Sequence, residues 1–177
     1  MTLTDSTHQQ SSIDAEHYRT VFRDHPAGVA VITADAGNGP AGLTATSVSS
    51  VSAAPAIVMF SLSNESSAAP TIARADTVVV HFMSTQQIEQ ALTFATSGID
   101  RFADSTSWRR LETGEPVLNS ADRWMRGKIS ARMVAGTATI VTIEVLEVHV
   151  EESEPAAAPL VYHARTWHRL GDHSRLN

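Results

Sequence analysis

Hydroxyl side chains gather in two short stretches, and these are the residues best suited to hold an anionic ligand. The first stretch contains Thr44, Thr46, Ser47, Ser49, Ser50 and Ser52, and the second contains Ser63, Ser66 and Ser67. Hydroxyl groups and loop N–H groups can bind a phosphate without a glycine-rich phosphate loop, especially near a helix N-terminus. The loop 63–69 leads into a short helix that we expect to begin at Pro70, so its serines are phosphate candidates.

An arginine could supply the charge that a phosphate needs, because a guanidinium group donates two parallel hydrogen bonds to it. The candidates near the expected loops are Arg74, Arg101, Arg109 and Arg110. Their spacing does not distinguish a ligand contact from an exposed, solvated side chain. The hydroxyl run has the same ambiguity, since Ser and Thr are also common on strand surfaces and in turns.

Histidine and cysteine point to no metal site. The chain has eight histidines and no cysteine, which excludes disulfides, thiolate metal sites and thiol nucleophiles. His163 and His168 lie five residues apart, and no His-Glu-x-x-His pattern occurs. The Gly-x-Gly-x-x-Gly, Walker and Gly-x-Ser-x-Gly motifs are also missing, so nothing local indicates a nucleophilic triad.

Charge and hydropathy exclude several classes of partner. The 177 residues carry a formal net charge of -6, which argues against a general nucleic-acid surface or an anionic membrane patch. No apolar run approaches the ~18–20 residues of a membrane span. Residues 1–10 show neither a basic start nor an apolar stretch, so we expect no secretory signal and a cytoplasmic location.

The elements that must position these residues are mostly short strands. A helix is expected from Asp14 to Pro26, and Val29–Thr33 with Gly42–Thr46 should form a hairpin. Further strands are expected at 57–62, 78–82 and 160–163, the one at 78–82 buried on both faces, and a helix at 85–96 capped by Ser84 or Thr85. Residues 97–117 are expected to be irregular.

Two long strands, 123–134 and 137–150, are expected to complete the sheet. In the second strand the apolar parity changes between Val145 and Leu146, which predicts a β-bulge or sharp bend at that point. Strands that bend in this way suit a small barrel. The pattern therefore favours a mainly β fold with a few helices, an antiparallel Greek-key or split barrel. We expect one domain over 13–172, a tail at 1–12 and another at 173–177.

Several segments together resemble the flavin reductase-like family, whose members are FMN-binding split-barrel proteins. They are Phe22–Thr33, Gly42–Ser52, Pro55 with the strand to Leu62, Ser66-Ser67 before Pro70, Arg101-Phe102, Pro116–Leu118, Pro159–His163 and Trp167–Leu170. Each segment alone is weak, but their order and spacing are specific. The resemblance covers roughly residues 15–170.

The resemblance implies a homodimer with a flavin near the subunit interface. The candidates it gives for flavin contacts are Thr44, Thr46, Ser47, Ser49 and Ser50. The loop that begins at Ser63 would hold the flavin phosphate, with Ser66 and Ser67 as its candidates and Arg101 as a further one.

One departure from the family pattern affects the expected activity. Many family members carry Gly-Asp-His before the last long strand, with the histidine beside the nicotinamide, whereas this chain has Gly136-Thr137-Ala138. Either another group, for example His163 or His168, serves the nicotinamide instead, or hydride transfer from NADH or NADPH is weak or absent.

The leading hypothesis is an NAD(P)H:flavin oxidoreductase that supplies reduced FMN or FAD to a separate oxygenase component. A flavin-binding carrier, sensor or partner subunit without reductase activity is the main alternative. A split-barrel oxidase, or a reductase that acts directly on a small organic substrate, is a third.

Overall fold

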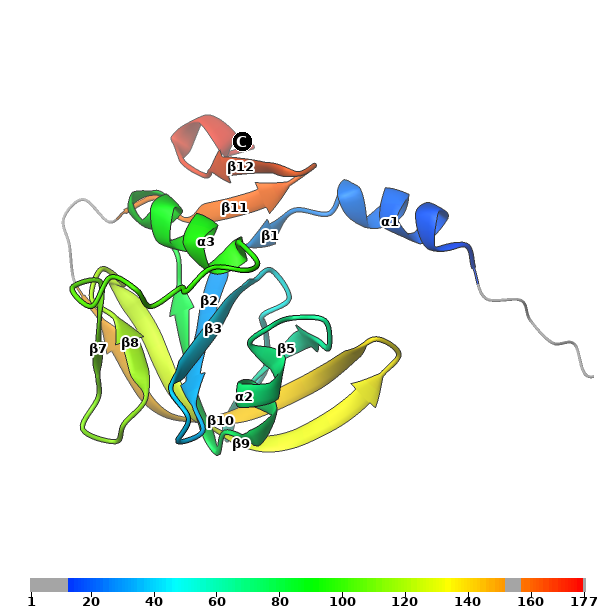
Figure 1. Ribbon diagram of the computed structural model, residues 1–177. Coiled ribbons are helices and arrows are strands. Elements are labelled where there is room, and N and C mark those ends of the chain that lie inside the picture. The colour runs from blue at the N-terminus through cyan, green and yellow to red at the C-terminus, as the bar shows by residue number, and fades with distance from the viewer. Residues whose placement is uncertain (1–12, 152–156, 177) are drawn as a thin grey trace, which may run out of the picture.

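The β-branched runs of the chain form a seven-stranded antiparallel sheet in the computed structural model, which describes residues 13–151 and 157–176 (Figure 1). The strand order is β3-β2-β6-β9-β10-β5-β4. In chain order these strands are β2 (Ala30–Asp35), β3 (Pro40–Ala45), β4 (Ser49–Ala53), β5 (Ala56–Ser63), β6 (Thr77–Phe82), β9 (Arg123–Ala135) and β10 (Ala138–Val150). The expected mainly β, antiparallel fold is thus confirmed.

Two small sheets and a few helices complete the fold. The small sheets contain β1 (Ala27–Gly28), β11 (Leu160–His163) and β12 (Thr166–Arg169), and the pair β7 (Trp108–Arg110) and β8 (Pro116–Leu118). The helices are α1 (Ala15–Arg23), α2 (Ala69–Arg74) and α3 (Ile88–Ala95), with the 3₁₀ turns η1 (Thr85–Gln87) and η2 (Asp172–Ser174). None of the helices in the described ranges is long and apolar enough to cross a membrane.

The chain connectivity forces the large sheet to curl. The edge strands β3 and β4 are consecutive in the chain and are joined only by residues 46–48. In a flat sheet the two edges would lie about 29 Å apart, because neighbouring strands are ~4.8 Å apart. The link spans at most about 14 Å at the maximal rise of an extended chain. The two edges must therefore approach each other, which is the split-barrel arrangement, and the link is where the hydroxyl run lies.

Two hydrophobic cores lie on the two faces of the sheet. Ile32 of β2 and Val80 of β6 pack in one of them, while their neighbours Val31 and Val79 pack in the other. These four side chains are fully buried, which explains why both strands are almost continuously apolar. Helix α2 contributes Ile72 to the first core. Helix α3 covers the second.

The expected bend in β10 is present. The pairing of β10 with β9 shifts register between Val145 and Glu147, where the apolar parity changes, and again between Thr142 and Ile143. An extra residue lets a strand turn its side chains to the other face. The expected cap of the helix that follows β6 is also present, since the Ser84 hydroxyl accepts from the Gln86 N–H at 3.3 Å.

The expectation of irregular structure at 97–117 is wrong for its second half, where β7 and β8 form a hairpin. Strands of three residues are too short to show a period. Polar contacts anchor this hairpin to the large sheet: the Thr33 hydroxyl donates to the Pro116 carbonyl at 2.5 Å, and Arg110 pairs with Asp35 at 2.6 Å. The expected tail at 1–12 lies outside the described residues, and part of the 173–177 segment belongs to η2.

His81 also holds this hairpin, from the centre of the sheet. The ring is fully buried, with Nδ1 2.9 Å from the Val31 carbonyl and Nε2 3.1 Å from the Leu118 nitrogen. Since the Leu118 N–H donates to Nε2, the proton of a neutral ring lies on Nδ1, where it is donated to Val31. Burial lowers the pKa of His81 to about 4.

The stability of the protein should therefore depend on pH through His81. The unfolded chain binds a proton below its ordinary pKa of 6.5, whereas the folded ring does so only near pH 4. The free energy of unfolding should consequently be about 2 kcal/mol lower at pH 5 than at pH 8, from this residue alone. Urea unfolding at several pH values measures it. His81→Gln, which does not titrate, should show a flatter profile, and identical profiles for the two proteins would contradict this assignment.

Candidate functional site

Two cavities meet at the link between β3 and β4. The first, which we call the serine cavity, has a volume of about 510 Å³ and is lined by Thr44–Ser47, Ser63, Ser66 and Arg101, among others. The second, the arginine cavity, has a volume of about 830 Å³ and is lined by α1, by residues 46–49 and by the turn after β11. Thr46 and Ser47 line both cavities. Their volumes lie within the usual range of small-molecule sites.

The serines of the second hydroxyl stretch present unused O–H groups. The Ser63 oxygen accepts from the Glu65 N–H at 3.4 Å, and the Ser66 oxygen accepts from the Ala68 N–H at 3.3 Å. Within the described part of the chain neither hydroxyl donates its proton to a protein acceptor. An oxygen fixed by an incoming bond and a free O–H is suited to donate to an anion. Both serines line the serine cavity, as does the exposed carboxylate of Glu65.

Ser67 does not line the serine cavity. It borders a smaller neighbouring hollow, and its oxygen accepts from Arg101 Nη1 at 3.0 Å. The same Nη1 donates to the Gly42 carbonyl at 3.0 Å, and both Nε and Nη2 donate to the Thr96 carbonyl. Arg101 thus connects β3, the serine loop and the end of α3.

Arg101 is the one arginine of the sequence candidates that the structure places in the lining of the serine cavity. Partial burial lowers its pKa from the ordinary value, so the guanidinium is incompletely solvated. A phosphate beside it would offset that desolvation. Arg109 and Arg110 belong to the β7–β8 hairpin instead, and Arg74 ends α2.

The members of the first hydroxyl run have different roles. The Thr44 hydroxyl donates to the Ala91 carbonyl of α3 at 2.7 Å, and the Ser47 oxygen accepts from the Ser61 N–H at 2.9 Å. The first bond ties β3 to α3, and the second ties the link to β5. Thr46 is exposed and lines both cavities, Ser49 lines the arginine cavity, and Ser50 lines neither.

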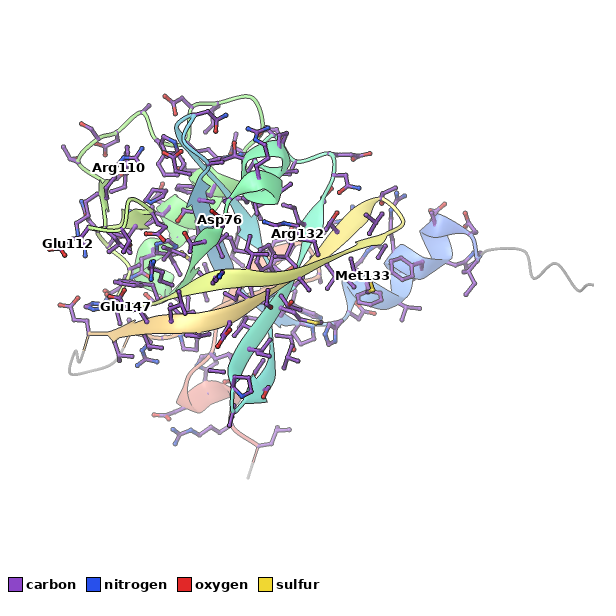
Figure 2. All side chains as sticks on the ribbon, turned by 90° about the horizontal axis from the view of Figure 1, so that it is seen from below. Asp76, Arg110, Glu112, Arg132, Met133 and Glu147 are labelled. Carbon is purple, nitrogen blue, oxygen red and sulfur yellow. The ribbon has the colours of Figure 1, made fainter. Side chains whose placement is uncertain are left out.

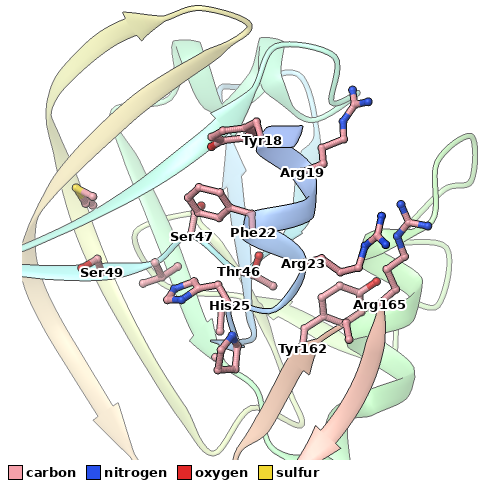
Figure 3. A pocket seen from close by; sticks show the side chains of 16 residues that line it. Tyr18, Arg19, Phe22, Arg23, His25, Thr46, Ser47, Ser49, Tyr162 and Arg165 are labelled. Atoms are coloured by element: carbon pink, nitrogen blue, oxygen red, sulfur yellow. The ribbon is translucent and has the colours of Figure 1, made fainter. Parts of the chain in front are cut away.

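The arginine cavity brings together residues that the sequence did not mark as a site. Tyr18, Phe22 and His25 come from α1 and the segment after it, and Tyr162 comes from β11 (Figure 3). The nicotinamide candidates Gly136, His163 and His168 line neither cavity. Gly136 lies at the β9–β10 turn, and the two histidine rings lie beside each other, with centroids 5.5 Å apart. The imidazole that lines the arginine cavity is instead that of His25. His25 is far in sequence from the other candidate residues, so no local motif indicated that it belongs to the site.

A model of the flavin reductase like domain matches residues 22–171 of the sequence. The chain belongs to the flavin reductase-like family. The family membership that the sequence resemblance predicts is therefore confirmed. Both cavities are built mainly within the matched range, and the part of α1 before Phe22 precedes it.

Named relatives of this flavin reductase-like chain agree with the assignment. An NADH:FMN oxidoreductase of Rhodococcus qingshengii is 44% identical over 160 residues, which cover 90% of this chain and 83% of that protein. The crystal structure of a flavin reductase domain protein from Arthrobacter sp. FB24 has a TM-score of 0.82 at 33% identity, covering 88% and 95% of the two chains. The Streptomyces globisporus NADH:FAD oxidoreductase SgcE6, in complex with NAD and FAD fragments, has a TM-score of 0.80 at 26% identity, covering 93% and 99%.

Proposed function

We propose that this flavin reductase transfers a hydride from NADH to FMN and releases reduced flavin to a separate oxygenase component. The observation that carries the proposal is the 44% identity, over 90% of the chain, to an NADH:FMN oxidoreductase. The serine cavity supports it, because its donors suit the phosphate of a flavin mononucleotide. FAD is the alternative to FMN as the flavin, and NADPH is the alternative to NADH as the hydride donor.

The residues of the serine cavity fit a flavin phosphate. Ser63 and Ser66 offer free O–H donors to the phosphate. Arg101, which is held in place by its bond to the Gly42 carbonyl, supplies a positive charge to the same cavity. Ser67 acts through Arg101, by accepting one of its N–H groups. Thr46 and Ser47 lie where the two cavities meet, so we assign them the middle of the flavin.

A flavin held here would supply the hydride acceptor, and the protein would contribute alignment and hydrogen-bond donors rather than acid–base chemistry. Reacting groups must approach within ~3–3.5 Å, so the nicotinamide needs an open cavity beside the flavin. The arginine cavity shares Thr46 and Ser47 with the serine cavity and provides that space. His25, which lines it, is a better candidate for the nicotinamide side than His163 or His168.

Two further parts of the proposal concern assembly and location. Exposed apolar side chains occur at both ends of the β9–β10 pair and are candidates for contact with the second copy that the family resemblance implies. Met133 (Figure 2) and Val134 lie near the hairpin turn, and Leu146, Val148 and Val150 lie at the far end. NADH is an intracellular donor, so a cytoplasmic location belongs to the same proposal.

Purified protein mixed with FMN and NADH should oxidise NADH continuously, well above the rate without protein. The test follows absorbance at the nicotinamide band, with excess FMN and oxygen to reoxidise the flavin. The substitution of Gly-Asp-His by Gly136-Thr137-Ala138 motivates the carrier alternative, which predicts tight flavin binding without turnover. A direct reductase would instead show flavin reoxidation that depends on its organic substrate in single-turnover experiments. Flavin binding with no NADH oxidation would contradict the proposed function.

A further inference from the structure

The serine cavity is lined by two charged side chains of opposite sign, Arg101 and Glu65. The other described residues of its lining are hydroxyl-bearing or apolar, so the formal charges of the lining cancel. A phosphate monoester such as that of FMN carries a charge of about -1.5 to -2 at pH 7. A cavity that served only to retain this group would carry an excess of positive charge. The Glu65 carboxylate is thus unfavourable to the ligand that the serines suit.

Arg101 has little hydrogen-bonding capacity left for a ligand. Its Nη1 donates to both the Gly42 carbonyl and the Ser67 oxygen, while Nε and Nη2 both donate to the Thr96 carbonyl. All but one of its N–H groups are therefore used within the protein. A bidentate contact with a phosphate would require Arg101 to break one of these bonds, so its positive charge offsets the Glu65 carboxylate only in part.

The Glu65 carboxylate is exposed and makes no ion pair with another described residue. Its backbone is nevertheless held at the cavity. The Glu65 N–H donates to the Ser63 hydroxyl at 3.4 Å, and the neighbouring Asn64 N–H donates to the Thr137 carbonyl at 3.0 Å. The Ser66 N–H donates to the Ser63 carbonyl at 3.1 Å. The loop therefore holds an uncompensated negative charge beside the two serines that would donate to the phosphate.

We propose that Glu65 limits the affinity of the protein for the flavin phosphate, so that FMN exchanges as a substrate and does not stay bound. The inference rests on the proposed function, in which reduced flavin leaves for a separate oxygenase component. The hydroxyls of Ser63 and Ser66 orient the phosphate, while the Glu65 carboxylate repels it. Water and salt weaken this repulsion but do not abolish it at short range. Riboflavin carries no phosphate, so Glu65 does not affect its binding.

The test variant Glu65→Gln removes the charge and keeps both the size of the side chain and the N–H that donates to Ser63. Its affinity for FMN should rise about fivefold, the effect expected of charges that lie close together next to bulk water. Its affinity for riboflavin should stay within about twofold. Glu65→Lys adds attraction to the loss of repulsion and should raise FMN affinity about 20-fold. The quenching of flavin fluorescence on titration measures all of these affinities.

Salt and a matched control separate a local charge effect from other causes. In about 1 M salt the Debye length falls to ~3 Å, so the gain of Glu65→Gln over the wild type should drop below about twofold. Glu112→Gln removes the same charge from an exposed residue between β7 and β8 that lines neither cavity, and it should keep both affinities. Bound FMN should also dissociate more slowly from both Glu65 variants, which stopped-flow dilution measures.

Several results would overturn the inference. FMN affinity of Glu65→Gln that is unchanged, or a rise of equal size for riboflavin, removes the repulsion from the argument, and so does an unchanged rate of FMN dissociation. Weaker FMN binding by Glu65→Gln shows that the carboxylate accepts a hydrogen bond from the flavin instead. An equal gain in Glu112→Gln assigns the effect to the net charge of the whole chain. Wild-type protein that binds no flavin, or binds it without oxidising NADH, contradicts the proposed function itself, a result separate from these.

Discussion

Replacing Ser63 and Ser66 together by Ala should weaken FMN binding about 100-fold and leave riboflavin binding within about twofold. Both hydroxyls line the serine cavity with unused O–H groups, and only FMN carries a phosphate to accept them. Hydrogen bonds to a charged group are worth about 1.5–3 kcal/mol each, so two of them account for that loss. The quenching of flavin fluorescence on titration measures both affinities.

The comparison of the two ligands makes this experiment specific. Misfolding or a shifted loop would weaken FMN and riboflavin alike, so equal losses would remove the phosphate from the serine cavity. Ser105→Ala with Ser107→Ala is the matched control, because these serines precede β7 and line neither cavity. The control should bind both ligands as the wild type does.

The strands that could be predicted from the sequence are those whose burial leaves a pattern. β6 is buried on both faces and is almost continuously apolar, and the bounds that the sequence predicts for β11 are the observed ones, 160–163. The apolar residues of β10 change from alternate positions on one face to alternate positions on the other after Val145, which predicts the observed bulge. Without an extra residue there, one of the two apolar sets would face solvent. Burial against a core is what makes such sequence patterns informative.

Turns and short strands left no such pattern. The turn between β11 and β12 uses Ala164 and Arg165 with φ of 48° and 63°, a left-handed conformation that Gly and Asn favour. Nothing in the pair Ala-Arg signals a hairpin, so the position of Arg165 beside α1 was not foreseen. The β7–β8 hairpin likewise depends on tertiary anchors rather than on its own residue pattern.

The candidate site was predicted in part. Residue types located the hydroxyl stretches, since Ser63, Ser66, Thr46 and Ser47 do line cavities. Residue types could not show which hydroxyl groups already donate a hydrogen bond within the protein, as the Thr44 hydroxyl does to the Ala91 carbonyl. In the arginine cavity, residue types marked Thr46, Ser47 and Ser49, but not the residues from α1 and β11, because these come from segments more than a hundred residues apart and meet only through the fold.

Removing the carboxylate of Glu115 should destabilise the protein by about 3–5 kcal/mol, the usual loss when one partner of a buried ion pair is deleted. Glu115 is 4% exposed and its Oε1 lies 2.7 Å from Arg126 Nε on β9. Burial by itself would raise the pKa of Glu115, but hydrogen bonds from Thr113 and Arg126 outweigh it and lower the pKa below its ordinary value. The carboxylate is therefore ionised at neutral pH, and Glu115→Ala leaves the Arg126 charge uncompensated. Urea unfolding at pH 7 measures the change.

The double variant Glu115→Leu with Arg126→Met separates the unpaired charge from the loss of packing. Replacing both members of a buried pair by apolar side chains is often neutral or stabilising, so the double variant should regain most of the stability that the single variant loses. The β7–β8 hairpin lines neither cavity, so FMN affinity of the folded fraction should stay at the wild-type level in both variants. A double variant no more stable than Glu115→Ala would show that the pair does not anchor the hairpin through its charges. Weaker FMN binding by folded protein would show instead that the hairpin helps to position the residues that line the serine cavity.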